Sequence, residues 1–460
     1  MKKHLLALAL SLCILTYNSI TCFALPIQTN EIPNWPVGPD VESEAAFLME
    51  AKTGVILYAK NAHQHMYPAS TTKIMTALLA AENSEMNETV SFSHDAVFSL
   101  EPGSSSIGID PGQSMPMEQC LYGIMVASAN EVANAVGEHV GGSIEGFVDM
   151  MNDKVKELGL KDTHFMNTNG LFDEDHYTSA YDLAFIAREF FSNEKLQKIG
   201  NTPNYHFVAT PTQPDDFYVR NKHKLINGDI PYEGIKGGKT GFVSESGETL
   251  VTCAENNGMK LICVVMNAPS PEQFYDTVKL FDYGFGNFQV TNIAENETNY
   301  SVKSVNTFPT SIDIIGNSKQ LMEINKDNYI IMPKNISFSD LSADLDFEDI
   351  SEGEIATINY SYHGAYLGKA AINSKGEEKK TLAFDESLDQ TVVEEKIVVE
   401  QPTFINILKI ASYVVAVTLV LIIISIIQSV LVNYNFLDNI REKRKTRRRR
   451  SRRDHGNLKF

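Results

Sequence analysis

Residues 249–267 read TLVTCAENNGMKLICVVMN, two apolar runs of β type separated by Asn257-Gly258. Asn-Gly is a strong signal for a two-residue hairpin turn, so antiparallel strands are expected over 249–254 and 260–267. A second hairpin is predicted far upstream, from Ala45–Glu50 and Val55–Ala59 around Thr53-Gly54. Because the two hairpins enclose a helix-rich middle, we expect them to pair in one antiparallel sheet of an α+β domain spanning residues 41–287.

The middle segment shows helical periodicity. Apolar residues share one helix face over 71–82 and over 182–191. Ser143 is predicted to cap a helix that ends at Gly159. After the second hairpin, Ser270-Pro271-Glu272-Gln273 is expected to open a final helix as a capping box, running to about Tyr283.

Short alternating segments follow, such as Ala356–Tyr362 and Tyr366–Asn373. They predict a small all-β domain over residues 288–385. Residues 386–404 are acidic and nearly free of aromatic side chains, which is typical of an extended stalk.

Both ends of the chain resemble targeting segments. Lys2 and Lys3 precede an apolar run and the small-residue ending Cys22-Phe23-Ala24, so residues 1–24 are predicted to be a secretory signal peptide, followed by a linker over 25–40. Residues 405–432 contain an uncharged stretch long enough to span a bilayer, and the basic tail 433–460 follows at once. The positive-inside rule then predicts a single-pass membrane protein with an extracytoplasmic body and a cytoplasmic tail.

Charge is distributed unevenly. The formal net charge is −19 although the last 28 residues are strongly basic, so the body between the two ends is strongly acidic. An acidic body argues against a nucleic-acid partner, which requires a basic surface.

The cysteines do not predict a metal site. Of five, Cys13 and Cys22 lie in the signal peptide, and the others form neither a CxxC pair nor part of an HExxH pattern. A bridge between Cys253 and Cys263 across the Asn257-Gly258 turn is one alternative, but buried free thiols are the expectation. No metal and no cofactor are predicted.

The first candidate for chemistry is Ser70, placed where a helix begins, with Lys73 one turn further on. Residues i and i+3 share a helix face, so the amine can reach the hydroxyl. A serine needs such a base to act as a nucleophile, and a lysine serves only if burial or a nearby positive charge depresses its pKa.

Two further motifs strengthen this interpretation. Ser128-Ala129-Asn130 interrupts two apolar helical stretches and is expected to turn polar side chains into a cleft. Lys239-Thr240-Gly241 precedes the second hairpin, and its small residues would let a substrate backbone lie along a strand edge.

These motifs, in this order, match the set found in penicillin-binding proteins and class A β-lactamases. Residues 42–287 resemble the D-alanyl-D-alanine carboxypeptidases of the S11 serine peptidase type. The resemblance lies in the three segments Pro68–Ala77, Ser128–Glu131 and Gly234–Phe242, and it continues through residues 152–171. The resemblance implies a β-lactamase/DD-peptidase-like fold, an antiparallel sheet with a helical subdomain. More weakly, residues 353–371 are similar to the family's C-terminal domain.

The resemblance also implies roles for the residues. Ser70 would attack the peptide carbonyl, with Lys73 as general base and Ser128 as proton relay to the leaving D-alanine. Asn130 would orient Lys73 and the substrate amide, while Lys239 and Thr240, followed by Gly241, would hold the terminal carboxylate. The oxyanion hole would be the backbone N–H groups of Ser70 and Phe242. The implied partners are peptidoglycan stem peptides ending in D-Ala-D-Ala, β-lactam inhibitors and the lipid bilayer.

Two features depart from the family pattern. Ala129 replaces a frequent glycine, and a predicted spanning helix replaces the usual amphipathic anchor.

Three other functions share some of these features. A β-lactamase would need a Glu-x-x-Leu-Asn-like loop, which is not found between Asn130 and Lys239. A membrane sensor would need an effector domain, and the tail is short. A transpeptidase would share the acyl-enzyme.

Overall fold

The computed structural model describes residues 32–101, 103–298, 322–347 and 354–374 of the 460-residue chain. The predicted signal peptide, stalk, membrane span and basic tail lie outside these residues. Within them, no helix combines the length and the apolar character needed to cross a bilayer.

A five-stranded antiparallel sheet forms the centre of the fold. Its strand order is β2-β1-β9-β8-β7, with bounds β1 Ala45–Glu50, β2 Ile56–Lys60, β7 Ile235–Val243, β8 Gly247–Asn256 and β9 Met259–Ala268. The two predicted hairpins pair through β1 and β9, in a register that sets Ala45 opposite Met266 and Glu50 opposite Leu261. The expected closure of the sheet is therefore confirmed, and β7 is left as an edge strand.

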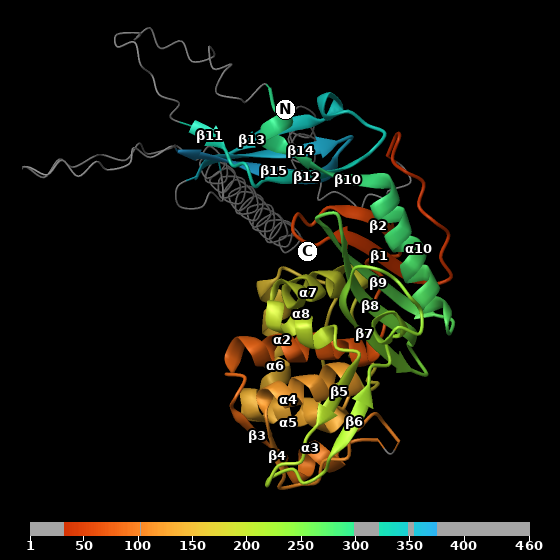
Figure 1. The fold of residues 1–460 in the computed structure, drawn as a ribbon, viewed down its shortest axis with the longest axis vertical. Coiled ribbons are helices and arrows are strands. Elements are labelled where there is room, and N and C mark those ends of the chain that lie inside the picture. Colours follow the sequence, from red (N-terminus) through yellow and green to blue (C-terminus); the bar gives the residue numbers. More distant parts are fainter. Residues whose placement is uncertain (1–31, 102, 299–321, 348–353, 375–460) are drawn as a thin grey trace, which may run out of the picture. The chain divides into compact units, whose positions relative to one another are not determined.

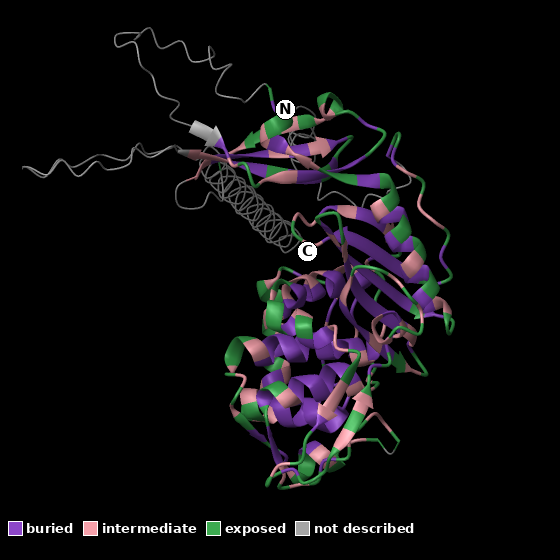
Figure 2. Cartoon of the chain, viewed as in Figure 1, coloured by how far each residue is buried: buried purple, intermediate pink, exposed green. Residues whose placement is uncertain are grey.

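Alternate residues of these strands enter two different cores, as the strand period of two requires. Phe47 of β1 and Val264 of β9 pack with the helical subdomain. Leu48 and Val265, their neighbours in the chain, pack with α10 (Glu272–Asn287) on the other face. Figure 1 shows α10 along one side of the sheet and α7 (Ala180–Ser192) on the other, and Figure 2 shows that the sheet and the central helices are mostly buried.

The helical subdomain contains the predicted helices with small shifts at their ends. Ser143 caps α6 and Ser179 caps α7, each through its hydroxyl. Besides α7, the helices of this subdomain are α2 Lys73–Asn83, α3 His94–Phe98, α4 Met117–Tyr122, α5 Asn130–Gly141, α6 Ile144–Glu157 and α8 Glu194–Gly200. A π-helical turn, Gly123–Ala127, lies between α4 and α5. Short ribbons and a small helix complete it: β3 Thr89–Ser91, β4 Ser114–Pro116, β5 Asn204–Phe207, β6 Phe217–Arg220 and α9 Lys224–Asn227.

The predicted start of α10 was wrong in one respect. The helix begins after Pro271 and has no side-chain cap, so the expected capping box is not formed. It also ends at Asn287 and not near Tyr283.

The C-terminal described segment consists mainly of strands, in agreement with the expected β character. β10 (Phe288–Asn292) pairs with β12 (Tyr329–Pro333), and a four-stranded sheet has the order β11-β15-β14-β13. Its bounds are β11 Met322–Ile324, β13 Ser342–Asp346, β14 Glu354–Tyr362 and β15 Ala365–Ser374, and α11 spans Ile293–Asn296. The domain boundaries proposed from the sequence stay predictions.

Part of the predicted linker is packed against the fold. Trp35 is only 6% exposed and lies 5.3 Å from Phe288 between ring centroids. Its indole N–H donates to the Leu57 carbonyl. Burying a tryptophan provides more apolar area than most residues can, which explains why the stretch around Trp35 packs against the fold.

The three cysteines outside the predicted signal peptide are buried and free, as expected. In the β8–β9 register, Cys253 lies opposite Ile262 and Cys263 opposite Thr252. Cys253 belongs to the core on the helical side and Cys263 to the core on the α10 side. The two thiols therefore point to opposite faces of the sheet, where no bridge can form.

We predict that these thiols are inert in the folded protein. Burial raises the pKa of Cys253 to about 12 and also raises the pKa of Cys120 and of Cys263, which suppresses the reactive thiolate. Iodoacetamide should label all three only after denaturation, as measured by mass spectrometry of the peptides. A non-reduced peptide pair linking Cys253 to Cys263 would contradict this prediction.

Candidate active site

The nucleophile candidate lies on a tight turn before a helix. Residues Ala69–Thr72 form a 3₁₀ turn, and α2 starts at Lys73. Ala69 has a φ of +48°, an uncommon left-handed conformation for a residue with a side chain. Ser70 is half-buried, while Lys73 is fully buried with its Nζ 3.0 Å from Ser70 Oγ. The predicted contact between the two is present.

Lys73 is held by two further acceptors. Its Nζ lies 2.6 Å from Asn130 Oδ1 and 2.6 Å from the carbonyl oxygen of Asn169. When the amine is neutral, its two hydrogens can serve these acceptors, which leaves the lone pair for the Ser70 hydroxyl. These contacts thus orient the Lys73 amine toward the Ser70 hydroxyl.

The charged form of Lys73 is disfavoured by its surroundings. Burial lowers its pKa well below 10.5, and the positive charge of Lys239 lowers it further, whereas the carboxylate of Glu131 opposes the shift. Of the two causes that the sequence analysis allowed, burial has the larger effect on the Lys73 pKa.

The segment 167–171 presses against the nucleophile turn. Gly170 has a φ of +84°, and a Cβ there would lie 1.8 Å from the Ala69 carbonyl oxygen, so only glycine fits. Asn167 Oδ1 accepts from the Gly170 N–H at 2.7 Å. This packing presents the Asn169 carbonyl to Lys73.

His176 braces the same region as a neutral ring. Its Nδ1 accepts from the Met166 N–H at 3.0 Å, so its Nε2 carries the proton and donates to Thr72 Oγ1 at 2.8 Å. Burial lowers its pKa to about 3. Both ring nitrogens are therefore occupied by structural hydrogen bonds.

The second motif follows the π-helical turn as expected of a loop facing a cleft. Ser128 has a φ of +63°, and its Oγ lies 3.0 Å from Lys239 Nζ. Asn130 is the first residue of α5. Ser128 and Asn130 thus connect the two buried lysines.

The third motif lies on the edge strand β7. Lys239 is 2% exposed, and burial followed by the charge of Lys222 lowers its pKa to about 7. A Cβ at Gly241 would lie 2.8 Å from the Pro68 carbonyl oxygen and 3.1 Å from the Ser70 nitrogen. Glycine at this position therefore lets β7 approach the nucleophile turn, whereas the Phe242 side chain is largely exposed.

A cleft of about 380 Å³ lies at this site, with Lys73, Asn130 and Lys239 outside its lining. It is lined by Ser70, Ser105, Ser128, Lys222, Lys224, Thr240, Gly241, Phe242, Glu248, Ser270, Gln273 and Phe274. The sequence prediction missed Lys222, Ser105 and the Asn169 carbonyl. An Asn-x-Asn-Gly stretch at 167–170 was a visible turn signal, but nothing in the residue types marked a backbone acceptor.

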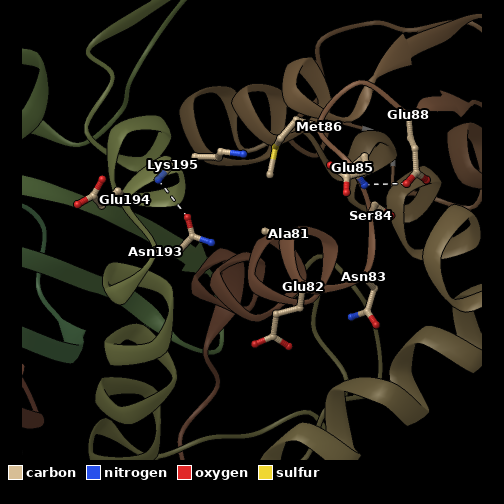
Figure 3. Close-up of a pocket in the computed structure, with 10 residues that line it drawn as sticks. All are labelled: Ala81, Glu82, Asn83, Ser84, Glu85, Met86, Glu88, Asn193, Glu194 and Lys195. Atoms are coloured by element: carbon tan, nitrogen blue, oxygen red, sulfur yellow. Dashed lines mark hydrogen bonds between the residues drawn. The ribbon is translucent and has the colours of Figure 1, made fainter. Parts of the chain in front are cut away.

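A larger hollow of about 610 Å³ lies elsewhere, between the end of α2 and the start of α8 (Figure 3). None of the predicted site residues lines it. The bonds drawn there, from the Lys195 N–H to Asn193 Oδ1 and from the Glu85 N–H to Glu88 Oε1, are local helix-end contacts.

The α+β fold thus places a buried lysine amine against a serine hydroxyl beside an edge strand. Among the described residues, no group of three or more His, Cys, Asp or Glu is arranged for a metal ion. The family model for D-alanyl-D-alanine carboxypeptidases, peptidase S11, matches residues 31–270. The chain therefore belongs to this family and is a serine-type carboxypeptidase.

Individual relatives agree with the family match. The D-alanyl-D-alanine carboxypeptidase DacF of Bacillus subtilis is 32% identical over 354 residues, covering 74% of this chain and 86% of the relative. Penicillin binding protein 5 of Haemophilus influenzae matches in structure with a TM-score of 0.59 and 26% identity, over 74% of this chain and 98% of that one. A DD-transpeptidase of Streptomyces has a TM-score of 0.51 and 27% identity, over 55% of this chain and 100% of that one.

The depressed pKa of Lys73 predicts the pH dependence of acylation. The neutral amine is the base, so the rate of acylation by a labelled penicillin should rise through the Lys73 pKa and level off well below pH 10.5. Lys73→Arg should abolish the reaction, because a guanidinium stays charged. Stopped-flow rates from pH 5 upward test this, and a midpoint at the ordinary lysine value would refute it.

We also predict that Gly241→Ala slows acylation by about 100-fold, because backbone atoms at Pro68 and Ser70 must move to admit the Cβ. Gly286→Ala is the matched control, since a Cβ there meets nothing within 4 Å. Acylation rates and melting temperatures of both variants are compared. Equal rates for the two variants would show that the close approach of β7 does not matter.

Proposed function

We propose that this carboxypeptidase removes the terminal D-alanine from peptidoglycan stem peptides through an acyl-enzyme on Ser70, and that penicillins acylate the same residue. One observation carries the proposal: a buried, oriented Lys73 amine lies 3.0 Å from Ser70 Oγ beside an edge strand that bears Lys239 and Thr240.

In the acylation step, Ser70 Oγ attacks the carbonyl carbon of the penultimate D-alanine while Lys73 Nζ takes the hydroxyl proton. The Ser70 and Phe242 N–H groups would hold the oxyanion. The C–N bond then breaks, and Ser128, which Lys239 Nζ contacts at 3.0 Å, relays to the leaving amine the proton that Lys73 took from Ser70. Lys73 is thereby neutral again for the next step.

In the deacylation step, water attacks the Ser70 ester, and Lys73 takes its proton and returns one to Ser70 Oγ. Asn130 keeps Lys73 oriented through both steps. Thr240 and Lys239 are proposed to receive the terminal carboxylate, and the exposed Lys222 adds positive charge to the same cleft.

We further propose that the enzyme acts outside the cytoplasm, anchored by residues 405–432 with the basic tail 433–460 inside. This rests on the sequence: an apolar uncharged stretch followed at once by a basic cluster.

Transfer to an amine is a second candidate, which the structural likeness to a DD-transpeptidase favours. Both reactions share the acyl-enzyme and differ in whether water or an amine attacks it. Product analysis with a cell-wall pentapeptide separates tetrapeptide from cross-linked product.

We expect the protein to release D-alanine from a peptide ending in D-Ala-D-Ala and to bind labelled penicillin covalently. Ser70→Ala should lose both activities, because no other hydroxyl contacts Lys73 Nζ among the described hydrogen bonds. Ser84→Ala, in the hollow of Figure 3, is the control and should retain both. Turnover by the Ser70 variant would exclude this nucleophile.

A further inference from the structure

Glu131 is a buried carboxylate beside the active site to which no role has been given so far. It follows Asn130 in the first turn of α5 and is 1% exposed. Its Oε1 accepts from Ser106 Oγ at 2.7 Å, from the Ile107 N–H at 2.7 Å and from the Gly108 N–H at 3.2 Å. One oxygen thus gathers three donors of a single loop.

The same loop is tied to Asn130 and reaches the cleft. The Asn130 N–H donates to the Ser105 carbonyl at 2.8 Å. Ser105 lines the cleft with Ser70 and Ser128, and its Oγ accepts from Lys222 Nζ at 3.0 Å. Two consecutive residues of α5 therefore hold the cleft wall that carries Ser105.

We propose that Glu131 is a positioning residue that holds residues 105–108 against the start of α5. It thereby places Asn130 to accept a hydrogen bond from Lys73, and Ser105 to accept one from Lys222. The inference rests on the proposed function of Ser70 and Lys73. Glu131 touches no reacting atom and acts through these neighbours.

The energetics support a role beyond stability. Glu131 Oε2 is buried and has no hydrogen-bond partner in the described part of the chain, so one lone-pair face of the carboxylate remains unsatisfied, which is costly. The N-terminal turn of α5 favours the negative charge, and hydrogen bonds to a charged acceptor are stronger than neutral ones. A neutral side chain would hold the loop less firmly.

The charge also acts on the base. Charged and titratable groups from four places affect or adjoin Lys73: Lys239 on β7, Lys222 before α9, Glu131 on α5 and the neutral His176. Glu131 is the group among those acting on Lys73 that favours its protonated form. Removing its charge should therefore stabilise the neutral amine and lower the Lys73 pKa further.

The test compares Glu131→Gln with Glu138→Gln in the full-length protein. Glu138 lies on the same helix and accepts from Ser93 Oγ at 2.9 Å, away from the cleft-lining residues. We expect Glu131→Gln to lower kcat/KM for D-alanine release at least 10-fold. It should also move the rising limb of the pH–rate profile for acylation to lower pH. Glu138→Gln should change neither quantity. Glu131→Asp keeps the charge but shortens the reach, so the limb should stay in place while kcat/KM falls.

A ¹³C NMR titration of the Lys73 ε-carbon gives a readout that does not depend on turnover. If the wild-type protein releases no D-alanine, the proposed function fails, and the titration still decides the effect of Glu131 on Lys73. If Glu131→Gln does not fold, Ser106→Ala removes one donor from an exposed position and should give a smaller loss in kcat/KM. An unchanged limb, titration and kcat/KM in Glu131→Gln would overturn the inference.

Discussion

The active site depends on two lysine amines buried within one small region. An ammonium group loses hydration on burial, and a second positive charge nearby adds repulsion, so both effects push the pKa down. Lys73 and Lys239 are nearly inaccessible and each has a lowered pKa. The neutral form of each amine is therefore favoured, which is the property that a serine nucleophile requires of its base. The surrounding fold provides this burial without leaving the amines unpaired.

Close backbone packing produces that arrangement. The edge strand β7 reaches the nucleophile turn because Gly241 has no side chain, and segment 167–171 reaches the same turn from another direction because Gly170 has none. At this turn the Lys73 amine lies 3.0 Å from the Ser70 hydroxyl. The strained Ala69 backbone belongs to this packing, in keeping with the tendency of unusual φ values to occur at functional sites.

The sequence predicted what residue types can encode locally. The Asn257-Gly258 hairpin, the Ser143 cap and the clustering of the three motif segments appear in the structure. What it did not predict depends on tertiary contacts. Asn169 contributes a backbone carbonyl, which any residue type carries, and Lys222 reaches the cleft from a loop without periodicity. The packing of Trp35 was not predicted, because the partner of its indole, the Leu57 carbonyl, lies 22 residues further along the chain.

The surroundings of Ser70 bear on the proposal that one amine serves both halves of the reaction. His176 has both ring nitrogens engaged, and His223 is buried with a pKa of about 3. Glu248 lines the cleft, but it lies on β8 opposite Phe242, one strand behind β7. Among the described residues lining or adjoining the cleft, Lys73 is thus the base that contacts Ser70. A β-lactamase uses a separate glutamate to activate its deacylating water. Under the proposed shared base, a bound group that displaces the Lys73 amine in the acyl-enzyme would slow deacylation.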